Sequence, residues 1–264
     1  MTFAGKTVVI TGATRGIGKA IGLRLAREGA TIVIAAKSVE ENPKLGGTIY
    51  TAATEMEAAG GKALAIPCDI RFEELIQQVV DKAVATFGGI DILISNAGTA
   101  IGGSIAEVDD KILRQSFEDN FFSHQNCASE SVKIMKKQNI EGCLLFNISK
   151  QSVNPGKNFG PYGLPKSALL NLCKQYAVDY GSLGIRSNGV NADRIRSGLL
   201  NDGMIKSRAK AREVSTDEYM RGNLLLNEVK AEDVAKAFFH LAVSKKTTGA
   251  VLTVDGGNIA ASLR

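Results

Sequence analysis

The chain has 264 residues, of which 44% are hydrophobic and 22% are charged, and this composition is close to the average of soluble globular proteins. Disordered and collagen-like architectures are therefore excluded. The 32 basic and 27 acidic residues give a net charge of +5, which suits an anionic small ligand. This excess is too small and too scattered along the chain to indicate a nucleic-acid partner.

The first residues show no signal-peptide pattern, and no stretch approaches the ~18 to 20 continuous apolar residues of a membrane span. We therefore expect a cytoplasmic protein with no membrane partner. The two histidines and four widely separated cysteines contain no C-x-x-C pair, so the sequence predicts neither a disulfide framework nor a metal site. Buried free thiols are expected at Cys68, Cys127, Cys143 and Cys173.

Short β-branched runs alternate with longer amphipathic segments along the chain. Helical candidates such as 17–28 and 72–87 are each followed by the glycine that commonly ends a helix. Because helices that connect successive strands imply a parallel sheet, we predict a single α/β domain over residues 1–264, with about seven strands and helices on both faces. The predicted strands cover residues 8–10, 31–36, 63–66, 90–94, 143–148, 185–190 and 251–254.

The least regular stretch, residues 192–229, is rich in arginine and glycine and precedes the final predicted helix and strand. Long irregular segments inside compact domains are often active-site lids. We therefore predict that this stretch is an insertion that covers a substrate.

A glycine-rich sequence, Thr11-Gly12-Ala13-Thr14-Arg15-Gly16-Ile17-Gly18, lies where the first strand should turn into the first helix. Gly12 permits the tight turn, Gly16 lets the backbone approach a pyrophosphate, and Gly18 allows close packing of helix and strand. The helix N-terminus adds unpaired N–H groups and the positive end of the helix dipole. The motif predicts a dinucleotide site formed by Gly12, Thr14, Arg15, Gly16, Ile17 and Gly18.

The second predicted strand ends at Ala35-Ala36-Lys37, the place where proteins that bind NAD usually carry a carboxylate for the ribose hydroxyls. No acidic residue stands there. Lys37 and Arg15 would attract a 2′-phosphate, which favours NADP(H), while NAD(H) stays possible. The alternative for both side chains is an exposed, solvated charge.

Further motifs follow in chain order: Cys68-Asp69-Ile70, Ser95-Asn96-Ala97-Gly98, Asn120, Ser149 and Tyr162-Gly163-Leu164-Pro165-Lys166. Together with the glycine loop they make the chain resemble the short-chain dehydrogenase/reductase family over almost its whole length. The resemblance implies a Rossmann-type doubly wound sheet and a homo-oligomer, a tetramer or a dimer. The segment Ala168-Leu169-Leu170 and Leu172 would then supply apolar contacts between subunits.

The resemblance also assigns roles to individual residues. Asp69 and Ile70 would meet the adenine, and the backbone of Ile195 would meet the carboxamide. The cofactor floor would be lined by Asn96, Ala97 and Gly98. The catalytic group would be Asn120, Ser149, Tyr162 and Lys166, and the last two would also contact the cofactor.

Two parts of the chain resemble different branches of this family. Residues 34–37 and 43–53 are similar to the hydroxysteroid-dehydrogenase-like branch, which supports Lys37 as a cofactor contact. Residues 217–219, 247–249 and 255–257 look like the dehydrogenase part of certain sugar-phosphate aldolase fusions. Because the two resemblances disagree about the substrate, the sequence leaves its identity open.

The residue types also fit the reduction of a carbonyl. Hydride transfer leaves a developing alkoxide that needs a proton, and a free tyrosine, with a pKa of about 10, is poorly matched to neutral pH. Lys166 follows Tyr162 by one helical turn, so its ammonium is expected to lower the tyrosine pKa. Ser149 would orient the carbonyl oxygen, and Asn120 would hold a water that passes protons to Lys166.

These residues predict an NADP(H)-dependent alcohol dehydrogenase or carbonyl reductase acting on a small-molecule substrate. The alternative is a non-catalytic dinucleotide sensor or scaffold, although such a protein need not keep both Tyr162 and Lys166. A sugar-nucleotide epimerase or dehydratase would need a longer chain with a dedicated substrate domain.

Two departures from the family pattern carry expectations of their own. Because proline is tolerated in the first turn of a helix, Pro165 predicts a helix that starts close to Pro161 or Tyr162. After the sixth strand the chain reads Asn191-Ala192-Asp193 instead of the usual Asn-Pro-Gly.

Three cations stand near the expected hydride site: Lys150, Arg194 and Arg196. They would favour a substrate that carries a carboxylate or a phosphate. The alternative is that the two arginines hold the insertion in place by ion pairs, with Asp193, Asp202 and Glu213 as candidate partners.

Overall fold

The computed structural model describes residues 2–43 and 45–259; Met1, Lys44 and residues 260–264 of the predicted domain lie outside the described residues. The described strands form a 7-stranded parallel sheet in the order β3-β2-β1-β4-β5-β6-β7. Each predicted strand overlaps an observed one, which confirms the predicted α/β fold class. The strands are β1 (Thr7–Thr11), β2 (Thr31–Ala36), β3 (Lys62–Pro67), β4 (Ile92–Ser95), β5 (Cys143–Asn147), β6 (Arg186–Ala192) and β7 (Val251–Val254).

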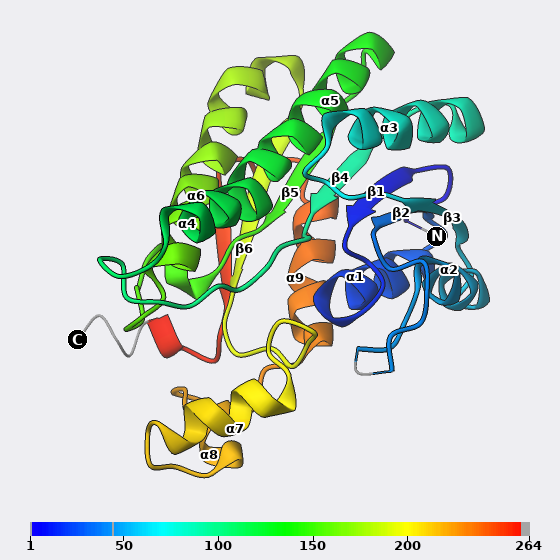
Figure 1. Cartoon of the computed structure of the whole chain (residues 1–264). Helices are drawn as coiled ribbons and strands as arrows, with labels where there is room; N and C mark the ends of the chain where they lie inside the picture. Colours follow the sequence, from blue (N-terminus) through cyan, green and yellow to red (C-terminus); the bar gives the residue numbers. More distant parts are fainter. Residues whose placement is uncertain (1, 44, 260–264) are drawn as a thin grey trace.

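Helices cover both faces of this sheet (Figure 1). The α-helices are α1 (Gly16–Ala26), α2 (Ile49–Ala58), α3 (Glu73–Phe87), α4 (Asp110–Phe117), α5 (Ser123–Gln138), α6 (Gly160–Tyr180), α7 (Asp202–Lys210), α8 (Thr216–Met220) and α9 (Ala231–Val243). Short turns of other types are η1 (Glu118–Phe122), η2 (Lys150–Ser152) and η3 (Gly181–Leu183).

The apolar core has two layers, one on each face of the sheet. One layer contains residues of α1, α2 and α9, such as Ile21, Met56 and Phe238, and the other contains residues of α3, α5 and α6, such as Val79 and Leu169. A parallel sheet buried on both faces needs apolar side chains in both directions, and every residue of β2 is buried. The strand order changes direction between β1 and β4, which places a ligand crevice at the carboxyl ends of these strands.

Helix α6 begins at Gly160, next to the start that Pro165 predicts. Pro165 itself lies in the second turn rather than the first, because the backbone N–H groups of Tyr162 and Gly163 already bond to the carbonyl of Phe159. The helix therefore continues through Pro165 with one backbone hydrogen bond missing.

The apolar residues predicted for subunit contacts on α6 mostly pack inside the subunit. Leu169 is fully buried in the core, and Leu170 and Leu172 pack against the same layer. The large apolar side chains that α6 exposes are Leu164 and Val178. The homo-oligomer stays a prediction.

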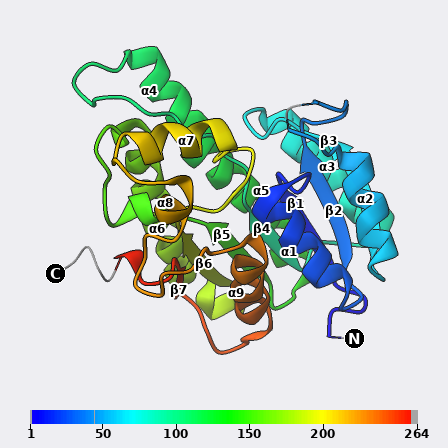
Figure 2. The same ribbon diagram turned by 90° about the horizontal axis from the view of Figure 1, so that it is seen from below.

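The irregular stretch 192–229 contains α7 and α8, which lie apart from the two helix layers in Figure 1. Viewed from below, in Figure 2, they lie across one end of the sheet. A small apolar cluster of Leu200, Ile205, Ala209, Tyr219 and Met220 holds them together. The four cysteines are buried and free, as predicted. Within residues 2–43 and 45–259 there is no helix with the length and apolarity needed to cross a membrane.

Candidate active site

A cavity of about 470 Å³ opens at the carboxyl ends of the strands, on the side covered by the insertion. It is lined by every residue that the sequence predicts for the cofactor and catalytic sites. We call residues 11–18, 95–98 and 147–149, together with Lys37 and Lys166, the floor of this cavity, and residues 193–229 its roof. The roof contributes Arg194, Ile195 and Arg208 among others.

The glycine loop has the open backbone that a phosphate group needs. Gly12 and Gly16 have φ angles of +71° and +55°, which side chains rarely adopt. A Cβ atom on Gly12 would lie 3.0 Å from Cα of Ala97, and one on Gly18 would lie 2.4 Å from the carbonyl oxygen of Gly12. Helix α1 starts at Gly16 without a side-chain cap, so its first N–H groups point to the cavity as an anion site. These features fit the pyrophosphate of a dinucleotide.

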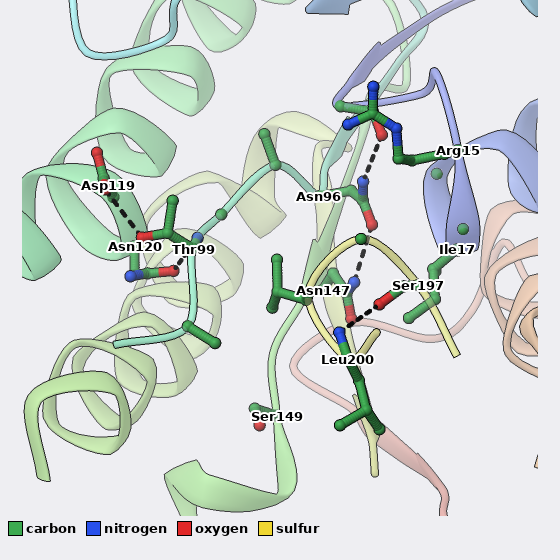
Figure 3. Close-up of a pocket in the computed structure, with 18 of the residues that line it drawn as sticks. Arg15, Ile17, Asn96, Thr99, Asp119, Asn120, Asn147, Ser149, Ser197 and Leu200 are labelled. Atoms are coloured by element: carbon green, nitrogen blue, oxygen red, sulfur yellow. Dashed lines mark hydrogen bonds between the residues drawn. The ribbon is translucent and has the colours of Figure 1, made fainter. Parts of the chain in front are cut away.

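Side-chain amides link the loops of the floor (Figure 3). Nδ2 of Asn96 donates to the carbonyl oxygens of Thr11 and Gly12 at 2.9 and 3.1 Å. Oδ1 of Asn96 accepts a hydrogen bond of 2.8 Å from Asn147, and Oγ1 of Thr11 accepts from the backbone N–H of Asn96 and Ala97. Asn96 therefore fixes the glycine loop against the ends of β4 and β5.

The end of β2 presents positive and hydroxyl groups to the cavity. Arg15 donates to Oγ of Ser38 at 2.9 Å and to the carbonyl of Gly46 at 3.0 Å, while the Lys37 side chain is 60% exposed. Lys37 lies 3.7 Å from Asp69, whose carboxylate is also paired with Arg71. Hydrogen bonds from Arg71 lower the pKa of Asp69, which keeps it ionised.

The two acidic residues that follow soon after β2, Glu40 and Glu41, are exposed and are not among the described residues that line the cavity. The ribose end of the predicted site therefore has cations within reach, and its carboxylate, Asp69, is already paired.

Asn120 lies in η1, a π-helical turn between α4 and α5, rather than in a regular α-helix. Such turns often occur at functional sites. The side chain is fully buried; its Nδ2 donates to the carbonyl oxygen of Ser116 at 3.0 Å, and its Oδ1 accepts from the Thr99 backbone at 3.2 Å. Thr99 also donates to Asp119, as Figure 3 shows. The Asn120 amide thus secures the loop after β4, and the water relay stays a prediction.

Ser149, Tyr162 and Lys166 meet at the end of the cavity away from β2. Burial raises the pKa of Tyr162, and a hydrogen bond with Ser149 opposes that effect. Burial lowers the pKa of Lys166 to about 7. Its Nζ donates to the carbonyl oxygen of Asn147 at 3.0 Å and lies 5.9 Å from the centre of the Tyr162 ring.

The expected lowering of the Tyr162 pKa by Lys166 is wrong, because burial raises this pKa instead. Burial disfavours both the phenolate of Tyr162 and the ammonium of Lys166, and a lysine with a pKa of about 7 is only partly charged at neutral pH. The upward shift of the Tyr162 pKa follows, and it keeps the hydroxyl protonated.

The roof arginines that the sequence placed near the hydride site are held by protein partners. Nη1 of Arg194 donates to the carbonyl oxygens of Tyr219 and Gly222 at 2.7 and 2.9 Å, and Nε lies 3.4 Å from Asp193. This geometry favours the structural alternative for Arg194.

Arg196 lies outside the cavity lining and forms ion pairs of 2.6 Å with Glu228 and 3.3 Å with Asp202. Asp193 and Asp202 are thus partners as predicted, whereas Glu228 takes the place expected for Glu213. Lys150 is not among the described residues that line the cavity, but it lies close enough to Asp193 and Arg194 to interact with them electrostatically.

Sequence reasoning missed several residues that line the cavity. A Cβ atom on Gly16 would lie 3.0 Å from Cβ of Ser197, so this serine lies directly over the glycine loop. Asn147 had a detectable signal, because a polar residue ends an otherwise apolar strand. Phe159 and Arg208 had none, since the tertiary fold alone brings them to Tyr162.

Comparison with known proteins identifies the family of the chain. A family model described as enoyl-(acyl carrier protein) reductase matches residues 12–258. Hydroxysteroid dehydrogenase-like protein 2 from Bos taurus is 65% identical over 182 residues, which are 69% of this chain and 42% of that protein. The uncharacterized oxidoreductase YuxG from Bacillus subtilis (strain 168) is 34% identical over 270 residues, which are 99% of this chain and 38% of that protein.

The fold also matches the crystal structure of carveol dehydrogenase from Mycobacterium avium in complex with NAD, with a TM-score of 0.89 and 24% identity over 97% of this chain and 98% of that chain. The chain belongs to the short-chain dehydrogenase/reductase family, a family of oxidoreductases that use a nicotinamide dinucleotide. It spans less than half the length of the curated relatives named above.

Proposed function

We propose that the protein transfers a hydride between NADP(H) and the carbon of a carbonyl or secondary alcohol, with Tyr162 as the general acid and base. The observation that carries this proposal is that one cavity has a phosphate cradle at one end and Ser149, Tyr162 and Lys166 at the other. When bound, the dinucleotide supplies the hydride. The chain itself supplies the cradle, the orientation of the carbonyl and the proton.

The proton comes from the Tyr162 hydroxyl, which stays protonated at neutral pH because burial raises its pKa. In the direction of reduction, the hydride adds to the carbonyl carbon and the tyrosine proton adds to the oxygen. Ser149 donates a hydrogen bond to that oxygen and orients it. Lys166, with a pKa of about 7, returns a proton to the tyrosine, and a water held at Asn120 passes protons to Lys166.

The preference for NADP(H) is supported by the groups at the end of β2. A 2′-phosphate would meet Arg15, Lys37 and the hydroxyl of Ser38. For NAD(H), the end of β2 provides no unpaired carboxylate of the kind that usually holds the ribose hydroxyls. The proposed function also includes a substrate lid, residues 192–229, because residues 193–229 form the roof of the cavity that Tyr162 lines.

The experiment that tests this function is spectrophotometric turnover of NADPH and NADH against ketones, aldehydes and 3-oxoacyl thioesters, compared between wild type and Tyr162→Phe. The variant should lose about 100-fold or more in kcat, because it removes the general acid, while its affinity for NADPH stays unchanged. Tyr180→Phe, on the same helix but outside the cavity, is the matched control. Wild-type turnover by Tyr162→Phe contradicts the role of Tyr162, and NADPH binding with no turnover of any carbonyl supports a dinucleotide sensor instead.

A further inference from the structure

Two cations of the roof line the cavity, Arg194 and Arg208, and of these two only Arg194 has an acidic partner among the described residues. Arg208 lies on α7 and lines the cavity, and its guanidinium forms no hydrogen bond or ion pair with any residue of the described chain. Arg194 and Arg196, in contrast, donate to backbone carbonyls or pair with carboxylates. Arg208 therefore keeps its N–H donors available to a ligand.

The position of Arg208 is set by the packing of its helix. Ile205 and Ala209 are buried in the small apolar cluster of the roof, which fixes the rotation of α7. The Arg208 guanidinium then lies over the Phe159 ring, 4.4 Å from its centre. Stacking on an aromatic ring holds a guanidinium in one orientation and leaves its edge free to bind two oxygens.

Phe159 connects Arg208 to the hydride site. The Phe159 ring meets the Tyr162 ring edge to face, with 6.4 Å between their centres. Arg208 is also close enough to affect the electrostatics of the Tyr162 hydroxyl. Arg208 and Tyr162 thus contact the same aromatic side chain and line the same cavity, so one small substrate can reach both.

The Asp193 carboxylate, which also interacts with Tyr162, does not neutralise the charge of Arg208. Asp193 also acts on Tyr162, but its carboxylate is paired with Arg194 and accepts a hydrogen bond from Asn258. The substrate end of the cavity therefore contains one neutralised pair and one cation without a partner among the described residues.

We propose that Arg208 binds an anionic group, a carboxylate or a phosphate, that the substrate carries a few bonds away from its reacting carbonyl. The proposal rests on the function proposed above and names its substrate class: an oxo acid or a phosphorylated ketone rather than a neutral ketone. A planar guanidinium forms two parallel hydrogen bonds with either anion, so Arg208 selects the charge and sets the distance from the anion to the carbonyl.

The test measures binding separately from turnover. The enzyme is saturated with NADP⁺, which does not reduce a ketone, and calorimetry gives Kd for 4-oxopentanoate and for its uncharged methyl ester. Wild type should bind the acid about tenfold or more tightly than the ester, and Arg208→Gln should remove this difference by weakening the acid alone. Lys206→Gln changes the same charge at an exposed site on the same helix, so it should keep the wild-type preference.

A second pair of probes identifies the anion: dihydroxyacetone phosphate against dihydroxyacetone shows whether a phosphate binds better than a carboxylate. Arg208→Lys should restore part of the preference, because it keeps the charge but loses the paired hydrogen bonds. Equal affinity of wild type for acid and ester in both pairs, or an equal loss of both with Arg208→Gln, overturns the proposal. Turnover of neutral ketones with no preference for anions contradicts this proposal alone, whereas anion binding without any turnover contradicts the proposed function and leaves the Arg208 site in place.

Discussion

The floor and the roof of the cavity are held in place by different kinds of interaction. In the floor, two side-chain amides and one lysine connect the ends of three strands: Asn96 donates to the carbonyl of Gly12, Asn147 donates to Asn96, and Lys166 donates to the carbonyl of Asn147. In the roof, a small apolar cluster is supplemented by ion pairs at the surface, and the arginine in the pair of Arg196 with Glu228 is 49% exposed.

The floor and the roof therefore differ in how much stability the loss of one interaction costs. Breaking a hydrogen bond between buried partners leaves groups without a partner, so the floor has a strong energetic preference for one geometry. Ion pairs at the surface contribute little and are screened by salt, so a single ion pair of the roof can be lost at low cost. A fixed floor suits a cofactor of constant shape, and a roof whose single ion pairs contribute little tolerates substitutions at those pairs.

The largest effect is expected where the floor buries a charge. Lys166→Met should stabilise the cofactor-free protein at pH 6 by on the order of a few kcal/mol. Below pH 7 the lysine is protonated in both folded and unfolded states, so the full cost of burying the ammonium is present. As the pH rises from about 7 toward the ordinary lysine value of 10.5, the folded state releases its proton first and the wild-type protein gains stability.

Denaturant unfolding between pH 6 and pH 10 measures this difference. It should be largest at pH 6 and should shrink as the pH rises. Lys174→Met, at an exposed site on the same helix, should show no such trend. A stabilisation by Lys166→Met that is the same at every pH would show that lost packing or helix propensity, and not the charge, is responsible.

The second-largest change in stability is expected when the hydrogen bonds of the floor amides are removed. Asn96→Ala removes bonds to Thr11, Gly12 and Asn147 and should lower the free energy of unfolding by about 1 to 3 kcal/mol. The affinity for NADPH should fall with it, because the glycine loop loses its support. Asn171→Ala, at an exposed site on α6, is the control and should be close to neutral. An Asn96→Ala variant as stable as wild type would remove the basis for the contrast between floor and roof.

Substitutions of Lys37, at the end of β2, test which residue of the floor determines the coenzyme preference. Lys37→Asp replaces attraction of a 2′-phosphate by repulsion and offers an acceptor to a ribose hydroxyl, so the ratio of kcat/KM for NADPH to that for NADH should fall about tenfold or more. Lys37→Met should show a smaller change, because it removes attraction without adding repulsion. If neither variant moves the ratio, Lys37 does not determine the choice of coenzyme.

The smallest effect is expected in the roof. Arg196→Gln breaks the pairs with Glu228 and Asp202 and should cost less than about 1 kcal/mol of stability, with the difference vanishing at high salt. KM should change equally for anionic and neutral carbonyl substrates, in contrast to Arg208→Gln. A selective rise in KM for the anions would place Arg196 in the substrate pocket after all.

The sequence alone was enough to predict the alternation of strands and helices and the glycine loop, which depend on local rules: apolar periodicity and the φ angles open to glycine. The resemblance to a known family added Ser149, Tyr162 and Lys166, and helical spacing then put the last two on one side of α6. The pKa of Tyr162 could not be predicted in this way, because its shift depends on burial by residues far away in the sequence.

What the tertiary structure decided is which charges are free. Arg194, Arg196 and Arg208 look alike in the sequence of the insertion, and each could have faced a substrate. The fold gives Arg194 two carbonyl partners, gives Arg196 two carboxylates, and leaves Arg208 stacked on Phe159 beside Tyr162. The partner of each arginine depends on which residues are in contact between α7, α8 and the start of α6. These contacts are determined by tertiary packing and not by spacing along the chain.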